Sequence, residues 1–343
     1  MLINRWEGRA WYYLQMSEKQ IVNEESTVEI DGQTFEIVKA TRLREGMVIK
    51  SGNVYGRVGP KQSTLEEQIH TEALYNRGFP VSEVVSSGDV GDGEWYFTEK
   101  SLGDKTFHEM FNSEYQQNGQ VSSATFDAYL AVIDAYTNAQ VKPSNHSDIS
   151  LQNFIERFAP NSRIYPSYIY FGYDFDEYKH ALKLASEKLQ SAAMGVLQFD
   201  LNPFNILEGG VIDFELVGYG PIGLDVLISA RWGSSWFTDY PSRYPVAYKL
   251  SQDQIAKSDT LVDDIATNSG LEKPTNYLQE FLLFKSAWAL QSDEGPKTDM
   301  PADKLAFGRF RANVLHATVG SYLQGKEIDP LTFPSIPGGE INT

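Results

Sequence analysis

The hydrophobic pattern of this chain changes near residue 100, and the change restricts the folds open to it. Between residues 27 and 100, short β-rich runs are separated by turn sequences such as Asp31-Gly32 and Ser51-Gly52-Asn53. Beyond about residue 105, apolar residues recur with helical spacing, and we expect helices over residues 126–140, 175–192, 277–291 and 303–324. Strands in one part of the sequence and helices in another predict an α+β fold.

The β-rich part is expected to form a small lobe with one helix. An antiparallel meander of three or four strands over residues 27–59 precedes a helix over residues 64–77. Ser63 begins a Ser-Thr-Leu-Glu capping box, and Gly78 stands where a helix-ending glycine belongs. Two further strands, PVSEVVSSG and EWYFTEKSL, are expected on either side of the glycine-rich turn GDVGDG.

A chain of 343 residues is long enough for two lobes. We expect the β-rich lobe to span residues 1–100, a larger helical lobe residues 101–330, and a loosely held tail residues 331–343. A cleft between two such lobes is a common place for a ligand.

The composition limits the classes of partner. The chain has 46 Asp and Glu against 29 Lys and Arg, so its net charge is −17, which argues against nucleic acid and anionic membrane as partners. This charge favours cations, whether metal ions or amine-bearing small molecules. Because the chain has no cysteine, disulfides, thiolate catalysis and Cys-ligated metal sites are excluded. No signal-peptide pattern or membrane-spanning run is visible, so we expect a cytoplasmic protein.

Two neighbouring loops carry the candidate chemistry. Asp200 is followed five residues later by Asn205, on a Pro-containing loop, and Asp213 comes eight residues after Asn205 in the run VIDFE. Apolar flanks anchor these polar residues to buried strands, so that the two loops can converge. The oxygens of Asn205 and Asp213 suit Mg²⁺, and a carboxylate such as Asp200 can accept a hydroxyl proton. Asn202 is expected to brace the loop.

These loops resemble the catalytic and metal-binding loops of the aminoglycoside phosphotransferase and choline kinase superfamily, over roughly residues 35–325. The resemblance implies a two-lobed, protein-kinase-like fold with ATP and Mg²⁺ as cofactors. It implies that Asp200 is the catalytic base and that Asn205 and Asp213 are the Mg²⁺ ligands. It also implies that Asp225, in the run GPIGLD, braces the loop. The chain departs from the family pattern at Gln198-Phe199, where the family has His-Gly.

In the small lobe, the resemblance implies a basic residue on the third strand that holds phosphates and pairs with a Glu on the helix. Arg57 occupies the place of that basic residue. Glu72, which falls on the same helical stripe as Ile69, is its expected partner. Lys50 and Lys61 are alternative partners of Glu72.

The remaining candidate contacts are less specific. Backbone groups from Glu99 to Ser101 are expected to hold the adenine, and Arg44-Glu45-Gly46 is the candidate for the phosphate-covering loop. Most aromatic side chains of the helical lobe are expected in the core. An aromatic wall beside acidic groups would nevertheless suit an amine-bearing substrate. The candidates for such a wall are Trp232, Trp236, Tyr240 and Trp288.

We therefore expect an ATP- and Mg²⁺-dependent phosphotransferase that acts on a hydroxyl of a small molecule, such as an aminoglycoside, a choline-like amino alcohol or a sugar-like compound. The alternative is a catalytically silent, kinase-like nucleotide-binding protein, which is suggested by Arg57 and by the missing His-Gly. The absence of a D-F-G and A-P-E pair disfavours a protein kinase. The acceptor, the choice between ATP and GTP and the oligomeric state stay open.

Overall fold

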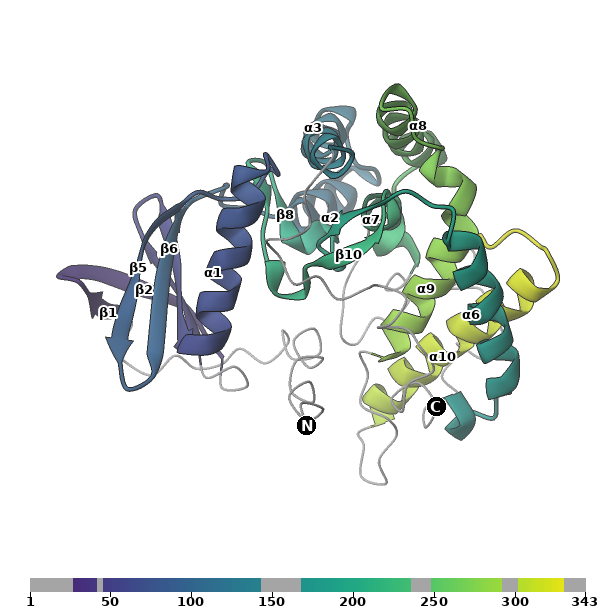
Figure 1. Cartoon of the computed structure of the whole chain (residues 1–343), viewed down its shortest axis with the longest axis horizontal. Helices are drawn as coiled ribbons and strands as arrows, with labels where there is room; N and C mark the ends of the chain where they lie inside the picture. Colours follow the sequence, from purple (N-terminus) through teal and green to yellow (C-terminus); the bar gives the residue numbers. More distant parts are fainter. Residues whose placement is uncertain (1–26, 42–45, 143–167, 236–247, 292–301, 330–343) are drawn as a thin grey trace.

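A six-stranded antiparallel sheet with one helix forms one lobe, and the other lobe is built mainly of helices (Figure 1). The computed structural model describes residues 27–41, 46–142, 168–235, 248–291 and 302–329. The strand order is β1-β2-β3-β4-β6-β5, which is the predicted meander followed by the predicted hairpin. The strands are β1 (Thr27–Ile30), β2 (Gln33–Thr41), β3 (Gly46–Ser51), β4 (Val54–Pro60), β5 (Val84–Gly91) and β6 (Glu94–Lys100).

Two-residue turns set the register of this sheet. Asp31-Gly32 and Asp92-Gly93 have positive φ at both residues, as the turn of a tight hairpin requires. The second turn is shorter than predicted, because β5 continues to Gly91. One sheet face carries a small apolar cluster of Ile30, Phe35, Ile49, Val58 and Tyr96. Side chains alternate along a strand, so Arg57 and Glu99 lie on the other face.

Helix α1 (Lys61–Asn76) follows β4 directly and begins three residues earlier than predicted. The predicted capping box is wrong: Pro60 occupies the N-cap, and the Ser63 hydroxyl donates to the Pro60 carbonyl oxygen at 3.1 Å. The predicted end is confirmed. Gly78 has a φ of 80°, and the amides of Gly78 and Phe79 donate to carbonyls of the last turn at 2.9 and 3.1 Å.

Seven helices make up the described part of the helical lobe, and the four predicted ones are confirmed as α3, α6, α9 and α10. They are α2 (Phe107–Asn118), α3 (Ser123–Gln140), α6 (Phe175–Leu189), α7 (Leu224–Ser235), α8 (Gln252–Asn268), α9 (Leu278–Gln291) and α10 (Ala302–Leu323). The sequence analysis does not predict α2, α7 or α8. In α7, apolar residues are buried on every side, so no amphipathic stripe marks the helix.

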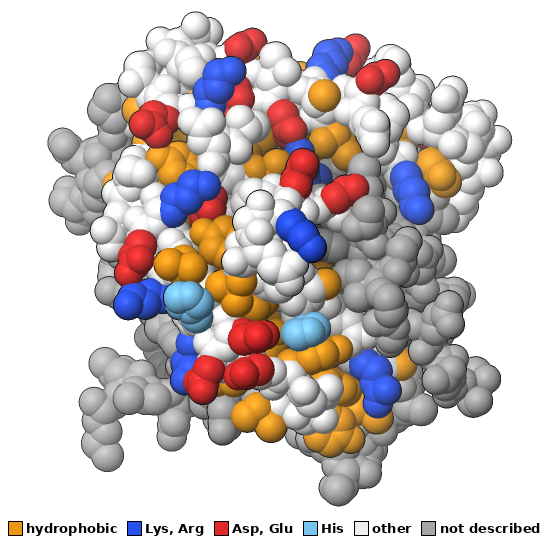
Figure 2. All heavy atoms as spheres, turned by 90° about the vertical axis from the view of Figure 1, so that its right-hand side faces the viewer, with side chains coloured by type: hydrophobic (Ala, Val, Ile, Leu, Met, Phe, Trp, Pro, Cys, Tyr) orange, Lys and Arg blue, Asp and Glu red, His pale blue; other side chains and the backbone are white. Residues whose placement is uncertain are grey.

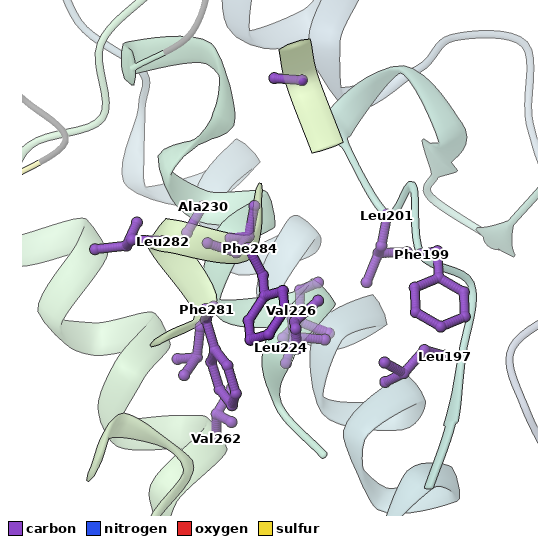
Figure 3. Close-up of a cluster of buried hydrophobic side chains, with 14 of the residues drawn as sticks. Leu197, Phe199, Leu201, Leu224, Val226, Ala230, Val262, Phe281, Leu282 and Phe284 are labelled. Carbon is purple, nitrogen blue, oxygen red and sulfur yellow. The ribbon is translucent and has the colours of Figure 1, made fainter. Parts of the chain in front are cut away.

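Short strands hold the two candidate loops between the lobes. They are β7 (Met194–Leu197), β8 (Ile206–Leu207), β9 (Gly210–Val211) and β10 (Gly218–Pro221), with 3₁₀ turns at Pro203–Asn205, Phe214–Leu216 and Pro274–Tyr277. Strand β7 pairs with β10, and β8 pairs with β9. Figure 3 shows how Leu197, Phe199 and Leu201 lie near buried side chains of α7 and α9. The helical core therefore anchors the segment on both sides of Asp200.

None of the helices in the described ranges has the length and apolar composition that a membrane span needs. The predicted turn residues Arg44 and Glu45 and the predicted tail, residues 331–343, lie outside the described residues. The predicted lobe limits, residues 1–100 and 101–330, stay a prediction.

Candidate active site

The Asp200 loop is organised around one backbone carbonyl. The Asp200 carbonyl oxygen accepts hydrogen bonds from the Asn202 amide N–H at 2.7 Å, from Asn202 Nδ2 at 2.9 Å and from Asn205 Nδ2 at 3.0 Å. Asn202 also accepts a bond from the Phe204 amide, so it braces the loop as predicted. Because the Asn205 nitrogen is engaged inside the loop, its amide oxygen is the atom that can face a metal.

The second loop places Asp213 beside the first. The Ile212 amide donates to the Asn205 carbonyl oxygen at 2.9 Å, which joins the two loops. Asp213 has a φ of 67°, an uncommon value for a residue with a side chain. Its Oδ1 atom is buried and accepts no hydrogen bond from the described residues, and the nearest cation is Arg57 Nη2 at 4.0 Å. A buried carboxylate oxygen in this state suits a metal ligand.

Gln198, which stands in the place of the family histidine, links the same two loops. Its Oε1 accepts a hydrogen bond from the Asp200 amide at 2.8 Å. Its Nε2 donates to the carbonyl oxygens of Ile212 and Asp213, at 3.2 and 2.7 Å. The glutamine side chain is fully buried, so these bonds fix the Asp200 loop relative to the Asp213 loop.

Asp225 braces this arrangement, as the resemblance implies. Its carboxylate accepts hydrogen bonds from the Gln198 amide at 3.0 Å, the Tyr136 hydroxyl at 2.8 Å and Gln140 Nε2 at 3.1 Å. Burial raises the pKa of Asp225 to about 6, although these donors favour the charged form. The start of the loop is thereby tied to α3 and α7.

Phe199 adopts a strained backbone conformation directly before Asp200. Its φ is 66°, where the family pattern has a glycine. A bulky residue in this region is a genuine outlier, and such strain concentrates at functional sites. The ring is buried in the core shown in Figure 3, and this burial holds the conformation.

The predicted ion pair between Arg57 and Glu72 is wrong. Arg57 Nε instead lies 2.9 Å from Glu67 Oε1 on α1. Glu72 accepts a hydrogen bond from Gln68 Nε2 at 2.8 Å. The alternative lysines do not pair with Glu72 either, because Lys50 pairs with Asp104 and Lys61 with Asp89.

The error comes from the phase of α1. The predicted stripe contains Ile69, whose side chain is 48% exposed. The buried stripe consists of Thr64, Gln68, Thr71 and Leu74. Because this stripe is mostly polar, apolar periodicity gives no guide to it, and Glu67 lies beside it.

The predicted adenine-binding strand is partly engaged within the small lobe. The Lys100 amide donates to the Glu83 carbonyl oxygen at 3.1 Å, and the Ser101 amide donates to the Asn53 carbonyl oxygen at 3.0 Å. Those two amides are therefore not available to adenine. Within the described ranges, the Ser101 carbonyl and the Leu102 amide make no such backbone bond.

Burial raises the pKa of the Glu99 side chain to about 7, while the charge of the nearby Arg57 opposes this.

Lys285 on α9 is a site residue that the sequence analysis missed. Its side chain is 6% exposed, and its Nζ lies 3.5 Å from Asp200 Oδ1. The same atom lies 3.7 Å from the ring centroid of Trp288, so a protein ammonium already covers a face of that ring. Burial lowers the pKa of Lys285 to about 8, while Asp200 opposes this. A lone lysine in the apolar run FLLFKSAWAL is the signal that could have found it.

The other predicted aromatic-wall residues fall outside the described part of the structure. Trp236 and Tyr240 lie in residues 236–247, and the side chain of Trp232 is likewise not described.

The chain is similar in structure to known proteins, although no protein-family model and no curated protein matches its sequence. A thermostable mutant of the aminoglycoside phosphotransferase APH(4)-Ia, in a ternary complex with ADP and hygromycin B, gives a TM-score of 0.51 at 13% identity, over 84% of this chain and 93% of that chain. A putative aminoglycoside phosphotransferase from Ralstonia eutropha JMP134 gives 0.52 at 12% identity, over 88% and 93%. The chain has the aminoglycoside phosphotransferase fold. The predicted two-lobed, protein-kinase-like α+β architecture is thereby confirmed.

The side chains of the two candidate loops suit a metal ion that is bound together with a nucleotide. Among the residues that the structure describes, no three His, Asp or Glu side chains gather into a metal site. Mg²⁺ bound with a nucleotide does not need such a cluster, because phosphate and water oxygens supply most of its ligands. Asn205 and the buried oxygen of Asp213 fit that requirement.

Proposed function

We propose that this protein is an ATP- and Mg²⁺-dependent phosphotransferase that acts on a hydroxyl of a small molecule. The observation that carries the proposal is the buried Asp213 oxygen, which accepts no hydrogen bond from the described residues and lies on a loop joined to that of Asp200. The fold supports it, since the APH(4)-Ia structure contains ADP and hygromycin B.

The residues of the site divide the work of the transfer. Asp200 accepts the proton of the acceptor hydroxyl, as the acceptor oxygen bonds to the γ-phosphorus and the bond to the β–γ bridging oxygen breaks, releasing ADP. Asn205 and Asp213 hold Mg²⁺, which neutralises phosphate charge when bound. Arg57, oriented by Glu67, holds the phosphates from the small lobe.

A catalytically silent nucleotide-binding protein is the second candidate. It is favoured by the ammonium of Lys285 beside the Asp200 carboxylate, because an ion-paired carboxylate is a weaker base. The two candidates share nucleotide binding and differ in turnover.

Two substitutions test the proposed reaction. Asp200→Asn removes the base, so kcat should fall by about 10²- to 10⁴-fold while ATP affinity stays within a few-fold. Asp213→Ala removes a charged metal ligand, so Mg·ATP binding should weaken and transfer should stop. Calorimetry and ATP consumption over a panel of hydroxylated small molecules, with ATP and with GTP, provide the measurements.

Asp176→Asn, at an exposed position in the first turn of α6, is the control and should leave both measurements unchanged. Undiminished turnover in Asp200→Asn would refute the mechanism. Tight nucleotide binding without transfer by the parent protein, to any acceptor of the panel, would support the silent alternative.

A further inference from the structure

The ammonium of Lys285 is buried with fewer acceptors than it has donors. An ammonium carries three N–H groups, and a buried donor without an acceptor is costly. Over the ranges that the structure describes, Lys285 Nζ has one acceptor, Asp200 Oδ1, and the distance of 3.5 Å is long for an ion pair. Its other close neighbour is the ring of Trp288. Two N–H groups therefore remain for a ligand.

The ligand must accept hydrogen bonds from an ammonium group, and an oxyanion is the strongest such acceptor. Burial is the main cause that lowers the pKa of Lys285, and the charge of Arg311, which is buried on α10, lowers it further. Asp200 and Asp225 act in the opposite direction. The pKa of about 8 leaves Lys285 mostly charged at pH 7. A buried cation that has a second buried cation nearby and one long contact to a carboxylate is stabilised by a further negative charge.

We propose that Lys285 binds an oxyanion next to Asp200. The identity of the reactants in this proposal rests on the proposed phosphotransferase function. The oxyanion is then either the phosphoryl group being transferred or a carboxylate or phosphate carried by the acceptor. Both supply oxygens for the N–H groups of Lys285.

An oxyanion site at Lys285 changes which chemical groups we expect on the acceptor molecule beside its reacting hydroxyl. An ammonium group of an acceptor would be repelled at this position, and the face of Trp288 that would attract it is occupied by Lys285. Amine groups of an acceptor therefore bind away from Asp200, and a neutral or anionic group lies beside the reacting hydroxyl.

Inorganic phosphate, without nucleotide or Mg²⁺, is the probe of the oxyanion site, and its binding is measured by calorimetry at low ionic strength and pH 7. Lys285→Met should weaken binding at least tenfold, and Lys285→Arg should keep it within a few-fold. Asp200→Asn should tighten binding several-fold, because it removes the competing carboxylate. The double variant should bind as weakly as Lys285→Met.

Lys183→Met, which removes an exposed lysine of α6, is the matched control and should bind as the parent does. Circular dichroism establishes that each variant is folded. If Lys285→Met does not fold, the tightening in Asp200→Asn still decides the question. Equal phosphate affinity in the parent, Lys285→Met and Asp200→Asn would overturn the proposal.

Kinetics then separate the two sources of the oxyanion. If it is the phosphoryl group, Lys285→Met lowers both ATP hydrolysis by water and transfer to every acceptor at least tenfold. If it belongs to the acceptor, Lys285→Met raises KM for anionic acceptors only and leaves hydrolysis unchanged. Absence of transfer in the parent would end the proposed function, whereas phosphate binding would still test Lys285.

Discussion

Side-chain amides, rather than charged side chains, hold the Asp200 loop in its shape. Gln198, Asn202 and Asn205 each hydrogen-bond to backbone carbonyls of the two loops. An amide offers both donors and an acceptor, so it fixes a loop without adding a charge to the site. In the proposed function, the charged groups of Asp200 and Asp213 are thereby left to act on reactants and metal.

Glu99 should make the stability depend on pH. Its pKa is raised from 4.5 to about 7 by burial, next to Arg57 and Glu67. Between pH 4.5 and pH 7, Glu99 is protonated in the folded protein and ionised in the unfolded chain. The free energy of unfolding therefore decreases as the pH rises from about 4.5 to 7, by about 3 kcal/mol at most.

Urea unfolding at pH 5 and pH 7.5 measures this contribution. The Glu99→Gln variant cannot titrate at this position, so its stability should decrease less over the interval than that of the parent. Identical decreases would show that Glu99 titrates normally in the folded protein.

At the scale of elements, the loop after β7 and the loop after β9 behave as one unit. The Ile212 amide bonds to Asn205, and the Gln198 side chain bonds to both loops. Asp225, at the start of α7, holds the beginning of the first loop by accepting a hydrogen bond from the Gln198 amide. A change in one loop is therefore transmitted to the other.

Replacement of Gln198 should separate the two loops. Gln198→Leu leaves the Asp200 amide and two carbonyls without their partner, so the free energy of unfolding should fall by about 2–4 kcal/mol. Gln198→His restores one donor and one acceptor and should lose less. Urea unfolding provides the stabilities.

Gln190→Leu, at the exposed end of α6, makes the same chemical change outside the site and should alter stability by less than about 0.5 kcal/mol. Equal losses in the Gln198 and Gln190 variants would contradict the role given to Gln198.

In the whole molecule, the β8–β9 hairpin joins the small lobe to the helices (Figure 1). The Val211 amide donates to the Pro80 carbonyl oxygen at 2.7 Å, and the Gly209 amide donates to the Leu102 carbonyl oxygen at 2.8 Å. The hairpin that precedes Asp213 is thus attached to the segments that flank the small sheet. Figure 2 shows the end of the helical lobe that lies away from the small lobe. Acidic and basic side chains are intermixed on that surface.

Gly210→Ala should disturb this junction. Gly210 has a φ of 148°, and an added methyl group would overlap the Pro80 carbonyl oxygen. We expect a loss of about 2–4 kcal/mol in the free energy of unfolding and weaker Mg·ATP binding, because the hairpin also carries Asp213. Thermal unfolding and calorimetry measure the two effects.

Gly270→Ala is the matched control, because Gly270 has a φ of 76° but no atom near the added methyl. It should cost only about 1 kcal/mol and leave nucleotide binding unchanged. Comparable losses in both variants would show that backbone strain, and not the contact with Pro80, determines the effect.

Local chemistry in the sequence was enough to predict much of this protein. The Asp31-Gly32 hairpin follows from residues that tolerate positive φ, and the Gly78 helix end follows from the same property. The amphipathic spacing of α6 identifies that helix. The spacing of Asp200, Asn205 and Asp213 predicts two joined loops, since short strands bring them together.

The tertiary structure alone decided which charges meet. Arg57 pairs with Glu67. The buried side of α1 is mostly polar, so no apolar pattern in the sequence reveals which side faces the sheet and which glutamate meets Arg57. Lys285 meets Asp200 across 85 positions of sequence, and no local periodicity relates residues so far apart. Periodicity specifies the faces of single elements, whereas the packing of elements from distant parts of the chain determines the partners of the buried charges.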